Sequence, residues 1–183
     1  MSCGKIDLRC RICRLSSGRT QVVPGKGSCS SRIVFVGEAP GKDEDLRGEP
    51  FVGRAGKILD EALADAGIGR GEVYITNLVK CRPPKNRRPR KDEIVACSGY
   101  LSSELKDLRP TVVCALGQTV AKSLFGESER MKELVGKAIP KQMGGLKVMA
   151  VIAYHPAACL YRRSNIKAFR NSIQRAVVIA KRQ

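Results

Sequence analysis

The chain has 183 residues, of which 43% are hydrophobic and 28% are charged. This composition excludes a disordered tail, and the length is enough for one domain to bury a core without disulfide support. No apolar run approaches the roughly 18 residues of a membrane span, and the segment from Met1 to Arg14 lacks the apolar stretch of a secretory signal. We therefore expect a single domain over residues 1–183 that is soluble and intracellular, with no membrane partner.

The net charge is the first functional indication. Lys and Arg number 34 against 17 Asp and Glu, which gives a formal net charge of +17. A field of this sign favours polyanions, because counterions released from a phosphate backbone drive association. Solubility alone would also explain a basic chain. The charge therefore indicates nucleic acid as the class of partner and says nothing about an activity.

In chain order, the first predicted element is a strand at Arg32–Gly37, a short apolar run of the kind that is buried on both faces of a sheet. Apolar residues at helical spacing predict a helix at Arg54–Ala66, and a second apolar run predicts a strand at Val73–Asn77. The remaining elements are a helix at Asp92–Leu108 capped by Asp92, a strand at Thr111–Gly117, a helix at Gln118–Phe125, a strand at Lys147–Ala153, and a C-terminal helix with Ile166, Phe169, Ile173, Val177 and Ala180 on one face.

Strands that alternate with helices predict an α/β protein. The expected architecture is a three-layer α/β/α sandwich with a central four-stranded parallel sheet and right-handed crossovers. Ligand sites in such sheets gather at the carboxyl ends of the strands. The residues that follow each predicted strand are therefore the ones to consider first.

Polar and glycine-rich loops follow these strands. The first strand runs into Gly37-Glu38-Ala39-Pro40-Gly41, whose glycines allow the backbone to approach a ligand closely and whose amides can hold an anion. A structural turn explains Gly and Pro equally well, and Glu38 has a structural alternative as a cap of the next segment. The loop becomes a candidate site only together with the residues that follow the other strands.

Three further residues fall at this edge of the predicted sheet. Asn77 ends one strand, and its amide offers the acceptor and donors that can recognise the edge of a nucleobase. His155, the single histidine, follows another strand; taken alone, a lone histidine is more often structural than catalytic. Phe51 lies in a glycine-rich loop outside any periodic stripe, where it can plug the core or stack on a base.

Eight cysteines also require an explanation, because disulfides are disfavoured in a reducing cytosol, with intracellular proteins of hyperthermophiles as an exception. Four thiolates can hold tetrahedral zinc or an iron–sulfur cluster, and spacing alone does not choose between them. The candidate ligands are Cys10, Cys13, Cys81 and Cys97, although Cys97 also has the helical phase of a small buried residue. Cys3, Cys29, Cys114 and Cys159 do not fit the ligand pattern, and Cys114 inside a strand is expected to be core.

Four loops in this order and spacing are together specific: GEAPGKDED from Gly37, PFVGRAG from Pro50, NLVKCRPP from Asn77 and HPAA from His155. With the cysteine spacing, they resemble the family 4 uracil-DNA glycosylases, the iron–sulfur group of archaea and thermophilic bacteria, from Cys10 to the C-terminal helix. The resemblance implies the family's uracil-DNA glycosylase-like fold, a four-stranded parallel sheet between helices. It implies hydrolysis of the N-glycosidic bond of deoxyuridine in DNA, which leaves an abasic site for base excision repair.

The resemblance also implies roles for the loop residues. The uracil would be bound by Gly37, Glu38, Gly41, Phe51, Asn77 and His155, with Phe51 stacked on the extruded ring and Asn77 paired with its O4/N3 edge. The catalytic residues would be His155, donating a hydrogen bond to O2 as a neutral imidazole, and Glu38, orienting water. The better-known family of uracil glycosylases has an aspartate where this chain has Ala39, so its general base does not transfer. The segment Glu44–Gly48 is a candidate for excluding thymine.

For the cysteines, the resemblance implies that Cys10, Cys13, Cys81 and Cys97 hold a [4Fe-4S] cluster. Its role is expected to be structural, because the proposed chemistry needs no electron transfer. It would fix the N-terminal segment and the basic loop Lys85–Lys91 to the sheet.

DNA contacts are expected from two exposed loops. After His155, either Leu160 or Tyr161 would fill the gap left by the extruded base, and Arg162, Arg163 and Ser164 would contact phosphates. Further phosphate contacts are expected from Lys85, Arg87, Arg88 and Arg90, for which a solvated run of charge is the alternative.

Two other functions remain open at this stage. A related uracil-DNA binding protein traps its ligand covalently through a histidine in a basic insertion, but Lys85–Lys91 contains no histidine. The second alternative function is that of a zinc-stabilised nucleotide hydrolase on a similar scaffold. We expect a monomer that binds uracil-containing DNA; the preference for single or double strands, activity on hypoxanthine and association with a replication clamp are left open by the sequence.

Overall fold

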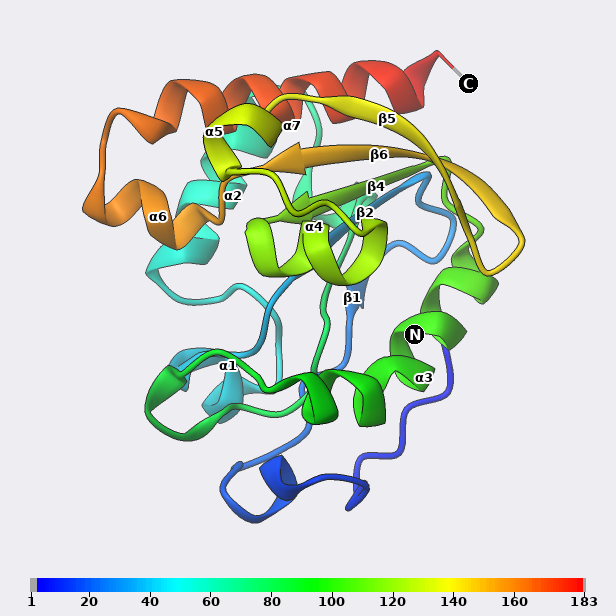
Figure 1. Ribbon diagram of the computed structural model, residues 1–183, viewed down its shortest axis with the longest axis vertical. Coiled ribbons are helices and arrows are strands. Elements are labelled where there is room, and N and C mark those ends of the chain that lie inside the picture. The colour runs from blue at the N-terminus through cyan, green and yellow to red at the C-terminus, as the bar shows by residue number, and fades with distance from the viewer. Residues whose placement is uncertain (1–2, 183) are drawn as a thin grey trace.

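The four predicted strands form the parallel centre of one sheet in the computed structural model of the chain, which describes residues 3–182 (Figure 1). Residues 1, 2 and 183 lie outside the described part. The central strands occur in the order β3, β2, β4, β6, and all neighbours are parallel. Their bounds are Ile33–Gly37 (β2), Tyr74–Asn77 (β3), Val112–Leu116 (β4) and Leu146–Ala153 (β6). Every residue of β2, β3 and β4 is buried, as continuous apolar runs predict.

Two antiparallel edge strands complete the sheet and were not predicted. The two-residue strand β1 (Lys26–Gly27) pairs with β3, and β5 (Ala138–Met143) pairs with β6. The sheet is therefore six-stranded and mixed, in the order β1, β3, β2, β4, β6, β5. The prediction of four parallel strands is correct for the centre and incomplete at the edges, where a strand is too short or too polar to give an apolar run.

Helices cover both faces of the sheet, as a three-layer sandwich requires. One face packs against α2 (Arg54–Asp65), α6 (Pro156–Tyr161) and α7 (Asn165–Lys181) through a core that includes Leu59, Leu63, Phe169 and Ile173. The other face packs against α3 (Lys91–Leu108), α4 (Gln118–Phe125) and α5 (Met131–Leu134) through a core that includes Leu101, Leu105, Val120 and Phe125. A further short helix, α1 (Lys42–Arg47), follows the loop after β2. The predicted α/β/α architecture is confirmed.

The start of α3 differs from the prediction. The helix begins at Lys91 with Arg90 as its N-cap residue, and the Glu93 carboxylate reaches back to accept the Arg90 N–H at 2.7 Å. Asp92, predicted as the cap, instead forms an ion pair with Arg14. The prediction was wrong because a glutamate in the first turn can serve the free backbone N–H in place of a capping aspartate.

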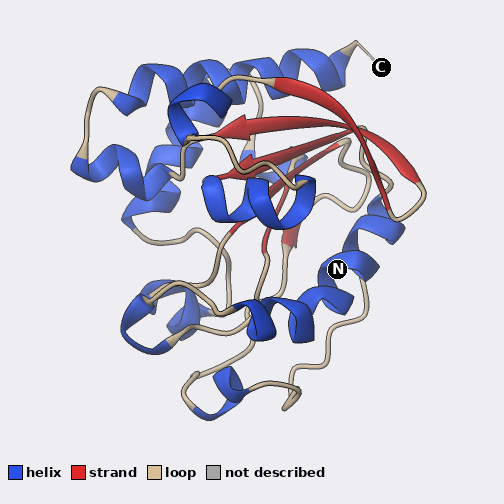
Figure 2. Cartoon of the chain, viewed as in Figure 1, coloured by secondary structure: helices blue, strands red, loops and turns tan. Residues whose placement is uncertain are grey.

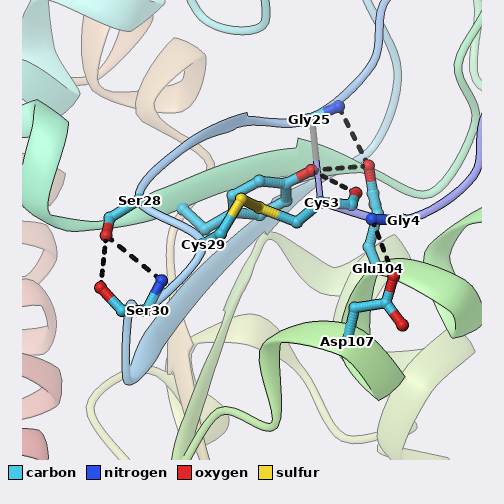
Figure 3. Close-up of a disulfide and its surroundings, with 9 residues drawn as sticks. Cys3, Gly4, Gly25, Ser28, Cys29, Ser30, Glu104 and Asp107 are labelled. Atoms are coloured by element: carbon cyan, nitrogen blue, oxygen red, sulfur yellow. Dashed lines mark hydrogen bonds between the residues drawn. A yellow bond between two sulfur atoms is a disulfide. The ribbon is translucent and has the colours of Figure 1, made fainter. Parts of the chain in front are cut away.

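The N-terminal segment from Cys3 to β1 is loop apart from the 3₁₀ turn Arg14–Ser17 (Figure 2). A small third core holds it against the chain that follows β3; its buried members are Leu15, Val22, Val79, Cys81 and Cys97. A disulfide between Cys3 and Cys29 and a hydrogen bond from the Gly4 N–H to Asp107 hold its other end (Figure 3). Within residues 3–182, no helix is long and apolar enough to cross a membrane.

Candidate active site

A cavity of about 460 Å³ opens at the carboxyl ends of the parallel strands. It collects residues from four loops that are far apart in the sequence. Its lining comprises Glu38, Ala39, Pro40, Gly41, Glu44, Phe51, Ala55, Asn77, Pro83, Asn86, Arg87, Arg88, His155, Ala157, Ala158 and Tyr161. The structure thus brings together Glu38, Gly41, Phe51, Asn77 and His155, as the positions of the strands predict.

Asn77 is the last residue of β3, paired in register with Gly37 of β2. Its side chain is nearly inaccessible, at 2% exposure, and its Oδ1 is the one buried side-chain polar atom in residues 3–182 without a hydrogen-bond partner. A buried carbonyl oxygen without a donor is costly, and such groups need a reason. The oxygen is therefore suited to accept a hydrogen bond from a ligand in the cavity.

Gly37 contributes by having no side chain. A Cβ at this position would lie 2.3 Å from the Asn77 Oδ1 and 2.5 Å from the Phe51 ring. Any other residue would displace both groups. Gly37 therefore shapes the cavity without lining it.

Phe51 forms a wall of the cavity in a strained conformation. Its φ is +53°, in the left-handed region that non-glycine residues rarely adopt, and its ring centroid lies 5.7 Å from that of His155. Gly56 allows this conformation, because a Cβ there would lie 1.8 Å from the Phe51 carbonyl oxygen. Backbone strain of this kind persists where surrounding structure holds it and gathers at functional sites.

His155 is the N-cap residue of α6, and its Nδ1 accepts the Ala157 N–H at 3.2 Å. A ring nitrogen that accepts a hydrogen bond carries no proton, so the neutral ring carries its proton on Nε2. Burial lowers the pKa of His155 to about 4, and the nearby Glu44 carboxylate only partly opposes this. At neutral pH the side chain is therefore an uncharged hydrogen-bond donor.

The two glutamates that line the cavity differ in their contacts. The Glu44 carboxylate accepts three backbone N–H groups, from Gly41 at 3.0 Å and from Val52 and Gly53 at 2.9 Å each. It thereby holds the loop after β2 against the Phe51 loop. The Glu38 side chain lines the cavity and makes no hydrogen bond within residues 3–182. The Glu44 carboxylate therefore holds the two loops together, whereas the Glu38 carboxylate can bind a ligand or water.

The predicted DNA-contacting residues differ in their position relative to this cavity, which Tyr161, Arg87 and Arg88 line. Tyr161 lines it and is 91% exposed, whereas Leu160 is half-buried and does not line it. The residues Arg162, Arg163, Ser164, Lys85 and Arg88 are exposed. Arg87 is engaged by the buried Glu93, with N···O distances of 2.8 and 2.6 Å. Its guanidinium holds the basic loop to α3, a role that the sequence did not predict.

The four cysteines predicted as ligands line a second, smaller cavity together. Cys10 and Cys13 come from the N-terminal segment, Cys81 from the chain after β3, and Cys97 from α3. Within residues 3–182, no three His, Cys, Asp or Glu side chains are arranged to hold a metal ion. Two donors contact the sulfurs: Arg19 reaches the Cys81 Sγ at 3.3 Å, and the Lys80 N–H reaches the Cys97 Sγ at 3.3 Å. Four thiols from three segments are a donor set for a metal ion or an iron–sulfur cluster, and the two N–H donors would stabilise thiolates there.

Two further features were missed by sequence reasoning. The Cys3–Cys29 disulfide could not be predicted, because residues in separate loops meet only in the folded chain. The buried pair of Lys80 with Glu104 had a visible signal: Glu104 shares a helical face with the apolar Leu101 and Leu108. A charged residue on a buried stripe indicates a buried partner.

Comparisons with known proteins identify the family of the chain. The family model of the uracil DNA glycosylase superfamily matches residues 24–177. The type-4 uracil-DNA glycosylase of Archaeoglobus fulgidus is 48% identical over 159 residues, which cover 85% of this chain and 80% of the relative. The Thermotoga maritima enzyme of the same name is 45% identical, with 86% and 81% covered, and the Saccharolobus solfataricus enzyme is 44% identical, with 84% and 73% covered. The chain therefore belongs to the uracil-DNA glycosylase superfamily and, within it, to the type-4 uracil-DNA glycosylases.

Proposed function

We propose that this chain excises uracil from DNA by hydrolysis of the N-glycosidic bond, with the residues that line the cavity at the carboxyl ends of the strands. The observation that carries the proposal is the buried, unpaired Oδ1 of Asn77 beside the Phe51 ring and the neutral His155. A base inside a stacked duplex cannot reach this depth, so the deoxyuridine must be extruded into the cavity.

Base recognition is assigned to Asn77 and Phe51. The Asn77 Oδ1 would accept the N3–H of uracil, and its amide nitrogen would donate to O4. Cytosine presents an acceptor and a donor in the reverse order, so it would leave the Asn77 groups buried and unpaired, which discriminates strongly. Phe51 would stack on the extruded ring.

Bond cleavage is assigned to electrostatic stabilisation of the departing base. As the bond breaks, the sugar gains oxocarbenium character and the uracil gains negative charge. His155 would donate from Nε2 to O2, and the backbone amides of the loop from Gly37 to Gly41 would help to hold the base. Glu38, the glutamate of the cavity without a partner, would orient the water that attacks C1′.

Thymine differs from uracil only in a methyl group, so its exclusion must be steric. Of the predicted segment Glu44–Gly48, only Glu44 lines the cavity. Three backbone N–H groups hold its carboxylate in place, so it can resist displacement by a methyl group. We assign the exclusion of thymine to Glu44.

The DNA surface is assigned to the loops at the mouth of the cavity. Tyr161 is better placed than Leu160 to fill the gap left by the extruded base, because it is exposed and lines the cavity. Arg162, Arg163, Lys85 and Arg88 would contact phosphates. We propose that a monomer acts on uracil in DNA.

For the second cavity we propose a [4Fe-4S] cluster held by Cys10, Cys13, Cys81 and Cys97. The cluster would supply structural cross-linking between the N-terminal segment, the chain after β3 and α3. The donors on Cys81 and Cys97 would stabilise thiolates there. Visible absorbance together with iron and zinc analysis tests this, and a colourless, zinc-loaded protein would overturn it.

The test of the function is a glycosylase assay on matched oligonucleotides that contain uracil, thymine or hypoxanthine, as single and double strands. We expect release of uracil and an abasic product, no release of thymine, and loss of uracil release or a shift towards cytosine in Asn77→Asp. A fully active Asn77→Asp enzyme would refute the recognition role. A denaturing gel separates excision from covalent trapping, because only trapping leaves a protein–DNA adduct.

A further inference from the structure

Lys80 and Glu104 form an ion pair in the interior, between the end of β3 and α3. Their side chains are 1% and 0% exposed, and the Lys80 Nζ lies 2.7 Å from the Glu104 Oε2. Replacing both members of a buried ion pair by apolar residues is often neutral or stabilising, so such a pair is weak evidence for a role in stability alone.

The hydrogen bonds of this pair are complete. The Lys80 ammonium has three donors and meets three acceptors: the Glu104 Oε2, the Thr76 hydroxyl and, at 3.0 Å, the backbone carbonyl of Asn77. Glu104 also accepts the Thr76 hydroxyl at 2.9 Å and the Tyr74 hydroxyl at 3.1 Å. It accepts the Gly25 N–H at 3.0 Å as well (Figure 3). The ammonium is thus held from three directions, and its position is fixed.

The backbone of Lys80 reaches the cysteine cavity at the same time. Its N–H donates to the Cys97 Sγ, and its carbonyl accepts the Val23 N–H at 2.7 Å. Only Leu78 and Val79 separate it from Asn77, and Cys81 follows directly. One buried residue therefore contacts both the backbone of the proposed base-recognition residue and a proposed cluster ligand.

The unpaired Oδ1 makes this contact important. Because no hydrogen bond within residues 3–182 fixes that oxygen, the position of the Asn77 amide depends on packing and on its backbone. The Asn77 carbonyl is the point at which Lys80 holds that backbone. A small displacement there would move the amide away from the edge of the base.

We infer that Lys80, held by Glu104, is a positioning residue for uracil excision: its ammonium fixes the Asn77 carbonyl and so places the Asn77 amide against the base. The inference rests on the proposed recognition role of Asn77. It adds a residue that lies outside the cavity and touches no substrate.

The test compares the Lys80→Met/Glu104→Gln double variant, called Lys80→Met below, with the native Lys80–Glu104 pair, so that neither protein buries an unpaired charge. Each is made with Asn77 and with Asn77→Ala, and single-turnover kcat/KM is measured on a uracil-containing single strand. With Asn77 present, we expect Lys80→Met to lower kcat/KM by about 10²-fold, the usual effect of a displacement of about 1 Å at a reacting centre. With Asn77→Ala, we expect no further loss, since residues that act as a unit are not additive.

A binding measurement covers variants too slow to assay. A strand with 2′-fluoro-deoxyuridine, which resists cleavage, is compared with a thymine strand by fluorescence anisotropy. We expect Lys80→Met to reduce the preference for the uracil strand only where Asn77 is present. Melting temperature and visible absorbance are recorded for every protein, and Leu108→Ala in α3 provides the control for lost stability.

Four outcomes are distinguishable. An equal loss with and without Asn77, or the same loss in Leu108→Ala at matched melting temperature, overturns the positioning role. Full activity in Asn77→Ala overturns the proposed function of Asn77 instead.

If Lys80→Met does not fold, Lys80→Arg replaces it. The planar guanidinium of arginine cannot meet three convergent acceptors as an ammonium does. We therefore expect Lys80→Arg to lower kcat/KM less than Lys80→Met, and to have no effect in the Asn77→Ala protein. A loss that persists in the Asn77→Ala protein overturns the inference.

Discussion

At the scale of single residues, His155 presents a neutral imidazole with a fixed tautomer, because its Nδ1 accepts the Ala157 N–H and burial opposes the charged ring. A neutral donor suits a leaving group that becomes anionic, since it stabilises the developing charge without surrendering its proton. The charged ring could not keep this arrangement, because a protonated Nδ1 would face the Ala157 N–H as a second donor. Burial and the N-cap contact therefore favour the same protonation state.

The pH profile should report this state. Burial lowers the pKa of His155 from 6.5 to about 4, so we expect kcat/KM to stay constant around neutral pH and to fall as the pH drops through about 4. Between pH 6.5 and a pH of about 4, the unfolded chain binds a proton at this histidine that the folded chain does not. The free energy of unfolding therefore decreases as the pH falls below 6.5. His155→Ala should lower kcat/KM by roughly 10²–10³-fold and lose this acid limb. An acid limb centred near 6.5 would contradict the assignment.

A second prediction at this scale concerns Glu44. Glu44→Ala removes the carboxylate that lines the cavity and holds the N–H groups of Gly41, Val52 and Gly53. We expect thymine release from a thymine-containing strand to become detectable and uracil release to fall, because the loops around the cavity loosen. Glu49→Ala, a charge change at the exposed ion pair with Lys26, is the matched control. If Glu44→Ala still rejects thymine completely, another group excludes it.

At the scale of elements, the sequence predicts the parts of the fold whose patterns are decided locally. The central strands β2, β3 and β4 were found because a strand covered on both faces must be apolar throughout. β1 has only two residues, and β5 alternates in exposure and contains Pro140, which belongs at a sheet edge. Such strands form because a neighbouring strand has unpaired backbone groups along its edge. This pairing leaves no pattern in the residues of the short strand itself.

The same distinction applies to the site. Asn77 and His155 were predictable as a pair, because the carboxyl ends of parallel strands meet at one edge of the sheet. The strained φ of Phe51 and the pair of Lys80 with Glu104 depend on contacts between distant segments. For the pair of Lys80 with Glu104, the sequence indication was limited to the position of Glu104 on an apolar helical face. Arrangement along strands is therefore predictable, and side-chain partners across segments are largely not.

The basic loop gives a prediction at the element scale, through two adjacent arginines with different surroundings. Arg88 is exposed at the mouth of the cavity, whereas Arg87 pairs with the buried Glu93 and holds the loop to α3. We expect Arg88→Ala to leave Tm unchanged and to reduce the slope of log Kd against log salt by about 1, as loss of one phosphate contact does. Arg87→Ala should lower Tm, because it leaves the Glu93 carboxylate buried without its partner. Identical effects of the two variants on Tm and salt slope would contradict this division.

At the scale of the whole molecule, one observed and one proposed cross-link attach the N-terminal segment to the α/β sandwich. The Cys3–Cys29 disulfide ties its beginning to the chain after β1 (Figure 3). The proposed cluster would tie its middle to the chain after β3 and to α3. Cys10 and Cys13 lie between Cys3 and Cys29, so the disulfide encloses half of the proposed cluster ligands in its loop. Opening it would leave the proposed cluster as the remaining cross-link of this segment.

The disulfide should therefore matter for stability and cluster retention more than for catalysis. The two bonded cysteines are 26 residues apart in the sequence. Closing such a loop stabilises the folded chain by about 3 kcal/mol, which raises Tm by roughly 6–12 °C for a chain of this size. We expect Cys3→Ser/Cys29→Ser to show this fall by calorimetry and to release iron to a chelator faster than the native chain, with kcat/KM unchanged at 25 °C, well below the transition. A dithiol reductant added to the native chain should reproduce the fall in Tm, because it breaks the same bond. Equal iron release from the two proteins would show that the cluster holds the segment without help from the disulfide.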